Sequence, residues 1–202
     1  MTNKNFTRHS LLLMVTALLF AGIATFAQNQ AKLLDIDVLA GRKIYALKKC
    51  GDCHNEGAAK FTPIKAKMDS ATISEHSVKL ELPIVIREEK TERKKRKALA
   101  EESAALAVYL KSRKEADAAA ANMVTAGFAM VRETCRNCHL INGLGKDTGP
   151  DLKGVGAKHD KKWLIDHFVN PQAFVKDSLM PKFDNLPKEE LEAMADYLLA
   201  HK

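Results

Sequence analysis

CGDCH, from Cys50 to His54, decides the fold of this chain, because the same pattern returns 85 residues later as CRNCH, from Cys135 to His139. The two five-residue motifs contain all four cysteines of a chain of 202 residues, and each motif ends in a histidine. A fixed internal offset is the usual sign of a structural unit that is used twice. Such a unit should repeat other residues at nearly the same distance.

The repeat extends well beyond the cysteines. Three further landmarks recur in the same order, 86 to 88 residues apart: Gly41, Pro63 and Tyr109 correspond to Gly127, Pro150 and Tyr197. This pattern predicts two domains, residues 28–113 and residues 114–202, joined by the polar, alanine-rich stretch SRKEADAAAAN. Domains of this size have small cores, so a large apolar prosthetic group would help to stabilise each of them.

The apolar periodicity of both halves is helical. Ile36, Ala40, Ile44 and Leu47 recur every three or four residues, which predicts a helix that ends near Lys49, just before the first motif. In the second half the same reasoning predicts helices over residues 119–134 and 187–200. No segment alternates in the way that a strand requires. The fold class is therefore predicted to be all-α, with each domain a small helical bundle.

Paired cysteines separated by two residues serve several chemistries. A zinc site needs four ligands at one point, and the two motifs could in principle meet to supply them. However, they lie in separate repeats, and the histidines would then have no role. A disulfide within one motif would be strained, and a thioredoxin-like site would need a βαβ pattern that is absent.

Covalent attachment of haem c uses the pattern Cys-x-x-Cys-His. The thiols of Cys50 and Cys53, and those of Cys135 and Cys138, would each form thioether bonds to one porphyrin. The adjoining histidines, His54 and His139, would each ligate the iron. The sequence thus predicts two covalently attached haem c groups, one in each half of the chain.

The second half also resembles the class I cytochrome c family. CRNCH is followed by GPDLKGVG, by WLIDHFVNPQAFVKDSLMPKF and by a closing helix with Tyr197. The resemblance implies that His139 is the proximal ligand, that Pro150 shapes the proximal wall and that Met180 is the distal ligand. It also implies that Gly127 and Tyr197 mark a close crossing of the first and last helices. Together the halves resemble dihaem cytochromes c.

The first half departs from this family at the distal ligand. The position equivalent to Met180 falls near Glu92, and a nearby Leu82–Pro83 step has leucine where the family has methionine. Three arrangements remain open: His76 coordinates the iron, Met68 coordinates it, or the sixth position is open. The remaining histidines, namely His159, His167 and His201, are interpreted as surface or packing residues.

The first 27 residues differ from the rest of the chain. Lys4 and Arg8 precede an apolar run, and small residues precede Gln28, as in a secretory signal peptide. We therefore expect cleavage near Ala27 and a soluble periplasmic protein. The alternative is an uncleaved N-terminal membrane anchor.

The formal net charge of +7 is concentrated in the run Arg87–Lys97, which has seven basic and three acidic residues. This run is either a solvated helix start or a docking patch for an acidic redox partner. Nucleic acid is not expected as a partner, because no aromatic residues interleave with the charges.

These features predict an electron carrier more readily than an enzyme. The second haem, with His139 and Met180, would have the higher reduction potential, and the first haem would receive electrons near the basic run. Two alternatives are an electron-accepting subunit of a larger periplasmic oxidoreductase and a haem enzyme or gas sensor with a five-coordinate first haem.

Overall fold

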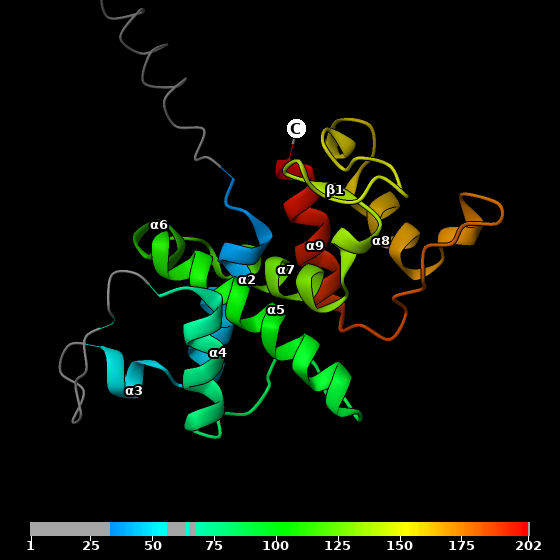
Figure 1. The fold of residues 1–202 in the computed structure, drawn as a ribbon. Helices are drawn as coiled ribbons and strands as arrows, with labels where there is room; N and C mark the ends of the chain where they lie inside the picture. The colour runs from blue at the N-terminus through cyan, green and yellow to red at the C-terminus, as the bar shows by residue number, and fades with distance from the viewer. Residues whose placement is uncertain (1–32, 56–63, 65–67, 202) are drawn as a thin grey trace, which may run out of the picture. The chain divides into compact units, whose positions relative to one another are not determined.

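The computed structural model describes residues 33–55, 64 and 68–201, and this part of the chain is mostly helical (Figure 1). The all-α prediction is therefore confirmed, whereas the division into two tandem domains stays a prediction. The predicted signal segment and Pro63 lie outside the described residues. The helices are α2 (Ile36–Leu47), α3 (Gly51–His54), α4 (Ser70–Lys79), α5 (Glu92–Lys111), α6 (Arg113–Asp117), α7 (Ala121–Arg132), α8 (Lys161–Val169) and α9 (Lys188–Ala200), with 3₁₀ turns η1 (Cys135–Asn137), η2 (Val155–Ala157) and η3 (Pro171–Ala173).

Several helices begin at a side chain that accepts a hydrogen bond from the first turn. Asp35 accepts from Asp37 N at 3.0 Å, and Asp160 accepts from Trp163 N at 2.7 Å. Such caps satisfy backbone N–H groups that have no partner within the helix. The predicted helices before each motif and at the C-terminus are present, shifted by one or two residues. Among the described residues, no helix is both long and apolar enough to cross a bilayer.

One short hairpin was not predicted. Strands β1 (Leu140–Ile141) and β2 (Leu144–Gly145) pair antiparallel directly after the second motif. The two residues between them, Asn142 and Gly143, have φ angles of 56° and 75°. An Asn-Gly step with two positive φ angles is the preferred two-residue hairpin turn. The Asn-Gly turn signal was present in the sequence. The two-residue strands, however, are too short to show an alternation of apolar and polar residues.

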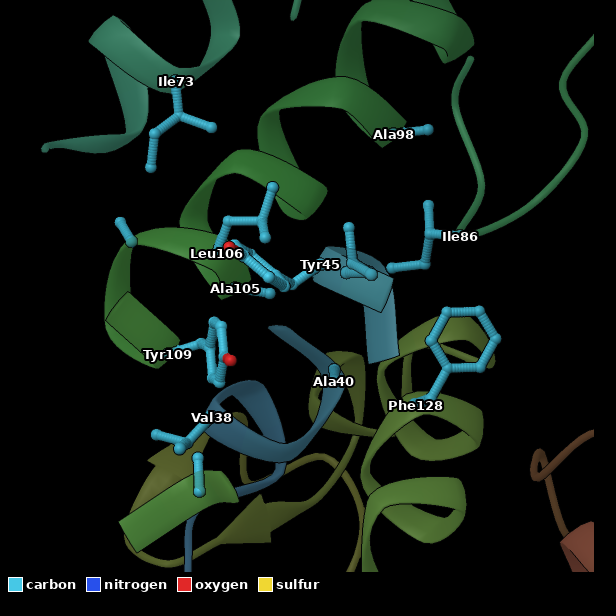
Figure 2. Close-up of a cluster of buried hydrophobic side chains, with 13 residues drawn as sticks. Val38, Ala40, Tyr45, Ile73, Ile86, Ala98, Ala105, Leu106, Tyr109 and Phe128 are labelled. Atoms are coloured by element: carbon cyan, nitrogen blue, oxygen red, sulfur yellow. The ribbon is translucent and has the colours of Figure 1, made fainter. Parts of the chain in front are cut away.

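Helix α2 packs against helices from both halves of the repeat. It contacts α5 from its own half and α7 from the other half, and α7 in turn contacts α9. Figure 2 shows that Phe128 of α7 belongs to the same buried cluster as Tyr45, Leu106 and Tyr109 of the first half. The chain from Leu34 onward consequently forms one compact unit.

Two glycines permit these close helix contacts. A Cβ at Gly41 would lie 2.2 Å from Ala105 O of α5, as expected for the crossing of the first and last helices of this half. The three atoms nearest to a Cβ at Gly127 belong to α2 and include Leu39 Cβ at 2.4 Å. The expected role of Gly127 at a crossing with α9 is therefore corrected, because Gly127 lets α2 approach α7. Gly156 lies against α9 instead, where an added Cβ would be 2.4 Å from Leu198 O.

Replacing Gly41 with alanine is expected to lower the free energy of unfolding by about 1–3 kcal/mol, because overpacking a rigid helix crossing forces the backbone to move. Thermal or denaturant unfolding measures this change. Ala46→Ser, at an exposed position of the same helix, is the control and should cost less than about 0.5 kcal/mol. An equal, small effect of both substitutions would contradict the close contact.

Polar contacts also join the halves at the start of α2. Arg136, inside the second motif, pairs with Asp35 and Asp37, and its Nη1 lies 3.1 Å from Asp35 Oδ1. Burial alone would raise the pKa of Asp35, but hydrogen bonds from Arg136 and its positive charge bring that pKa below the usual range. The hydroxyl of Tyr197 donates to Leu34 O at 3.0 Å. The second motif is thereby held against the N-terminal end of α2.

Candidate haem sites

The first motif folds into a single helical turn. Cys50 precedes α3, and its carbonyl accepts from His54 N at 3.0 Å and from Cys53 N at 3.3 Å. Residues three and four apart on a helix lie on one face. Cys50, Cys53 and His54 are thus placed together, as attachment of one porphyrin through two thiols and one imidazole requires.

A partly open cavity adjoins this turn. Its lining includes the two thiols and His54, together with the aliphatic side chains Ile64, Ile73, Leu80, Leu82, Leu106 and Leu110. Cofactor sites are mostly apolar clefts with a few polar groups. The apolar lining with two thiols and an imidazole therefore fits a haem. Both open candidates for the distal ligand, Met68 and His76, also line this cavity.

A buried ion pair lies next to the first motif. Lys48 Nζ is 2.9 Å from Glu102 Oε2, and the two side chains are 1% and 0% exposed. Lys48 Nζ also donates to Pro83 O at 2.5 Å, and Ile86 N donates to the other carboxylate oxygen of Glu102 at 2.6 Å. The pair ties the end of α2, two residues before Cys50, to α5 and to the loop after α4. Nothing in the sequence distinguished these two residues from surface charges.

In the second motif, the imidazole of His139 is fixed by a hydrogen bond. Its Nδ1 lies 2.8 Å from Pro150 O. A carbonyl can only accept, so Nδ1 carries the proton and Nε2 keeps the lone pair that binds a metal. Gly149 packs against the same ring, since a Cβ there would lie 2.7 Å from His139 Cε1. The Gly149–Pro150 step therefore orients His139 as a ligand, which fits the predicted haem.

Met180 lies in the loop between η3 and α9. Gln172 Nε2 donates to Ser178 O at 3.1 Å and to Met180 O at 3.2 Å, and Met180 N donates to Ser178 Oγ at 3.3 Å. The side chain of Met180 is half-buried, whereas that of Leu179 is 99% exposed. The loop is thus held by its own hydrogen bonds with the methionine turned inward relative to its neighbour.

An aromatic cluster connects α8 to the same region. Trp163 stacks on His159 at 3.4 Å and on His167 at 4.7 Å between ring centroids, and His167 lies 5.3 Å from Phe174. Burial lowers the pKa of His167, and the charges of His159 and His139 lower it further. His159 and His167 are therefore packing residues, as expected, and both stack on Trp163.

The two motifs lie at opposite ends of α2. The first motif follows Leu47 at the C-terminal end, and Arg136 of the second motif pairs with Asp35 and Asp37 at the N-terminal end. A helix of 12 residues is about 18 Å long. The four cysteines consequently cannot converge on one zinc ion. Among the described residues, no three His, Cys, Asp or Glu side chains are grouped so that they could hold a metal ion.

The cysteines are unpaired thiols among the described residues. Burial raises the pKa of Cys50 above its usual value and that of Cys135 to about 12.

The basic run begins α5. Arg93 to Lys97 occupy its first two turns and are exposed, while Leu106 and Leu110 of the same helix line the first cavity. Arg96 and Leu106 are ten residues apart, or about 15 Å along a helix. The part of the run on α5, which we call the basic cluster (residues 93–97), is therefore about three turns of that helix from Leu106. Its place beside the first haem stays a prediction.

Comparison with known families supports the interpretation of the second half. Residues 143–199 match the family described as cytochrome C oxidase, mono-heme subunit/FixO. The match contains Pro150, Met180 and Tyr197 and begins four residues after His139. No curated protein and no solved structure matches the chain. The match supports a cytochrome c-type domain in this part of the chain and a haem c electron-transfer role.

Proposed function

We propose that this protein is an exported dihaem c-type cytochrome that transfers electrons between redox partners, with one haem in each half of the repeat. The observation that carries the proposal is the recurrence of Cys-x-x-Cys-His at the end of a helix, beside a cavity in the first half and beside the Pro150 carbonyl in the second. Haem iron supplies the one-electron chemistry, and the chain supplies ligands, burial and orientation.

At the second site, His139 and Met180 are the proposed ligands. His139 Nδ1 lies 2.8 Å from Pro150 O and donates its proton to that carbonyl. This hydrogen bond keeps His139 in the tautomer whose Nε2 is available to bind iron. A thioether is a soft, neutral ligand, and histidine–methionine ligation raises the reduction potential. We therefore assign the higher potential to the second site.

We further propose that the protein works with, or within, a larger oxidoreductase complex in the periplasm. The matched family is named for a cytochrome oxidase subunit, which favours such a partner. Export is proposed from the signal-like residues 1–27. A membrane association is proposed only for the case in which this segment is retained.

The experiment that tests the proposal is the intact mass of the protein matured in a host that attaches haem c. The purified protein should exceed the polypeptide mass by two iron-porphyrin groups. Cys50→Ala/Cys53→Ala and Cys135→Ala/Cys138→Ala should each retain one group. A bare polypeptide mass, or bound zinc in place of haem, would overturn the proposal, and cleavage near Ala27 would be visible in the same spectrum.

Charge reversal of the basic cluster is expected to stabilise the protein and weaken its docking. Arg93 and Lys94 make no ion pair with another described residue, and they lie in the first turn of α5, which favours negative charge. Replacing both with glutamate should raise the free energy of unfolding by about 0.5–2 kcal/mol at low ionic strength. Electron transfer with a negatively charged donor protein should become slower, and its salt dependence should weaken.

Lys79→Glu is the matched control for the helix-end effect. Lys79 lies in the last turn of α4, where a positive charge is favourable, so its reversal should destabilise the protein. If all of these substitutions changed stability in the same direction, the helix-end account would be incorrect. If the basic-cluster variant kept the wild-type salt dependence of electron transfer, the cluster would not be a docking surface.

A further inference from the structure

Two histidines face one another in the first cavity. The ring centroids of His54 and His76 are 6.0 Å apart, and the ring planes are inclined by 51°. His54 belongs to the first attachment motif, whereas His76 lies on α4, more than twenty residues later. Both side chains line the same cavity together with Cys50 and Cys53.

This separation is close to the one that two axial imidazoles require. A metal–nitrogen bond is about 2 Å long, and the coordinating nitrogen lies about 1 Å from its ring centroid, so two imidazoles on opposite sides of one metal have centroids roughly 6 Å apart. The rings are not stacked on each other, unlike His159 and Trp163 at 3.4 Å and 11°. The distance between His54 and His76 is therefore compatible with one iron between the two imidazoles.

We propose that His76 is the second axial ligand of the haem iron that His54 binds, which makes the first site a bis-histidine haem. The proposal rests on the proposed function, because it requires a haem attached to Cys50 and Cys53. It resolves the three arrangements that the sequence left open at the first site in favour of the histidine.

Helix α4 holds His76 in this position. Asp69 caps the helix by accepting from Thr72 N at 2.8 Å. Ile73 and Ser77 are 5% and 2% exposed and turn one face of α4 toward the core, where the helix packs against α5. His76 lies three residues after Ile73 and is exposed on the cavity side. Its position is therefore set by the packing of a capped helix and not by a loop.

Several other cavity residues with donor atoms are engaged elsewhere. Met68 packs against the main hydrophobic cluster. Lys48 is paired with Glu102 at 2.9 Å, and the hydroxyl of Tyr45 donates to Asn55 Oδ1 at 3.2 Å. Leu82, at the Leu-Pro step where the family has methionine, supplies an aliphatic wall without a donor. Among the described lining residues, His76 is thus the side chain best suited to complete the coordination of this iron.

The proposal makes the two sites electronically different. The second site would have histidine and methionine, which raise the reduction potential relative to two histidines. Electrons would therefore reside preferentially on the second haem, at the other end of α2. Transfer from the first site to the second would be downhill.

The test replaces His76 with alanine in the mature dihaem protein and records low-temperature electron paramagnetic resonance of the oxidised form. The wild type should show only low-spin haem. In His76→Ala, half of the haem should become high-spin, and half should bind carbon monoxide after reduction. His76→Met should return that half to low-spin with a raised reduction potential. Met68→Leu and His159→Ala are the controls and should keep the wild-type spectrum.

Two results would overturn the proposal: a high-spin first haem in the wild type, or conversion of the first haem to high-spin by Met68→Leu but not by His76→Ala. Intact mass is measured on every variant. If a variant carries two haem groups but its spin state differs from the one expected here, only the role of His76 is refuted. If the wild type lacks the first haem, the dihaem function itself is refuted.

Discussion

Replacement of Glu102 with leucine should lower the free energy of unfolding by about 3–5 kcal/mol, because it leaves the ammonium group of Lys48 buried without its partner. The two backbone N–H groups of Val85 and Ile86 would lose their acceptor as well. We expect the loop after α4 to loosen and the first haem to be incorporated less completely. Denaturant unfolding and the haem-to-protein ratio measure these two effects.

A double substitution separates the charge from the packing. Lys48→Met/Glu102→Leu removes both charges and should recover most of the lost stability, since well-packed apolar residues often replace a buried ion pair without cost. Asp166→Ala removes the partner of Lys162 in an exposed pair and should have little effect. If Glu102→Leu were as mild as Asp166→Ala, the Lys48–Glu102 pair would not be buried as described.

Replacement of Met180 with leucine should lower the reduction potential of one of the two haems by on the order of 0.1 V, a fraction of the roughly 0.8 V range that axial ligands cover. Leucine is similar in size but has no donor atom, so the iron loses the thioether that favours its ferrous form. A spectroelectrochemical titration that resolves both haems measures the shift. The potential of the first haem should stay constant.

Met194→Leu is the matched control for Met180→Leu. Met194 is 2% exposed on α9 and packs in the core, so leucine there should cost less than about 1.5 kcal/mol and shift neither potential. A shift of both potentials by Met180→Leu, or of neither, would argue against Met180 as the ligand of the second haem.

The sequence alone determined the features that depend on short spacing. The apolar repeat at every three or four residues predicted helices α2, α7 and α9, because helical geometry brings such residues to one face. The motifs from Cys50 to His54 and from Cys135 to His139 predicted the attachment chemistry for the same reason. Met180 was identified by its place in a loop pattern shared with a family.

Only the tertiary structure decided how the halves pack and which distant groups meet. Gly127 packs on α2, and Arg136 pairs with Asp35, so that the motifs lie at opposite ends of one helix. Lys48 and Glu102 form a buried ion pair, and His54 lies 6.0 Å from His76. These contacts join residues 22 to 101 positions apart, and no local periodicity encodes such pairings. Burial and charge pairing arise from the packing of whole helices, which is why they appear only once the chain has folded.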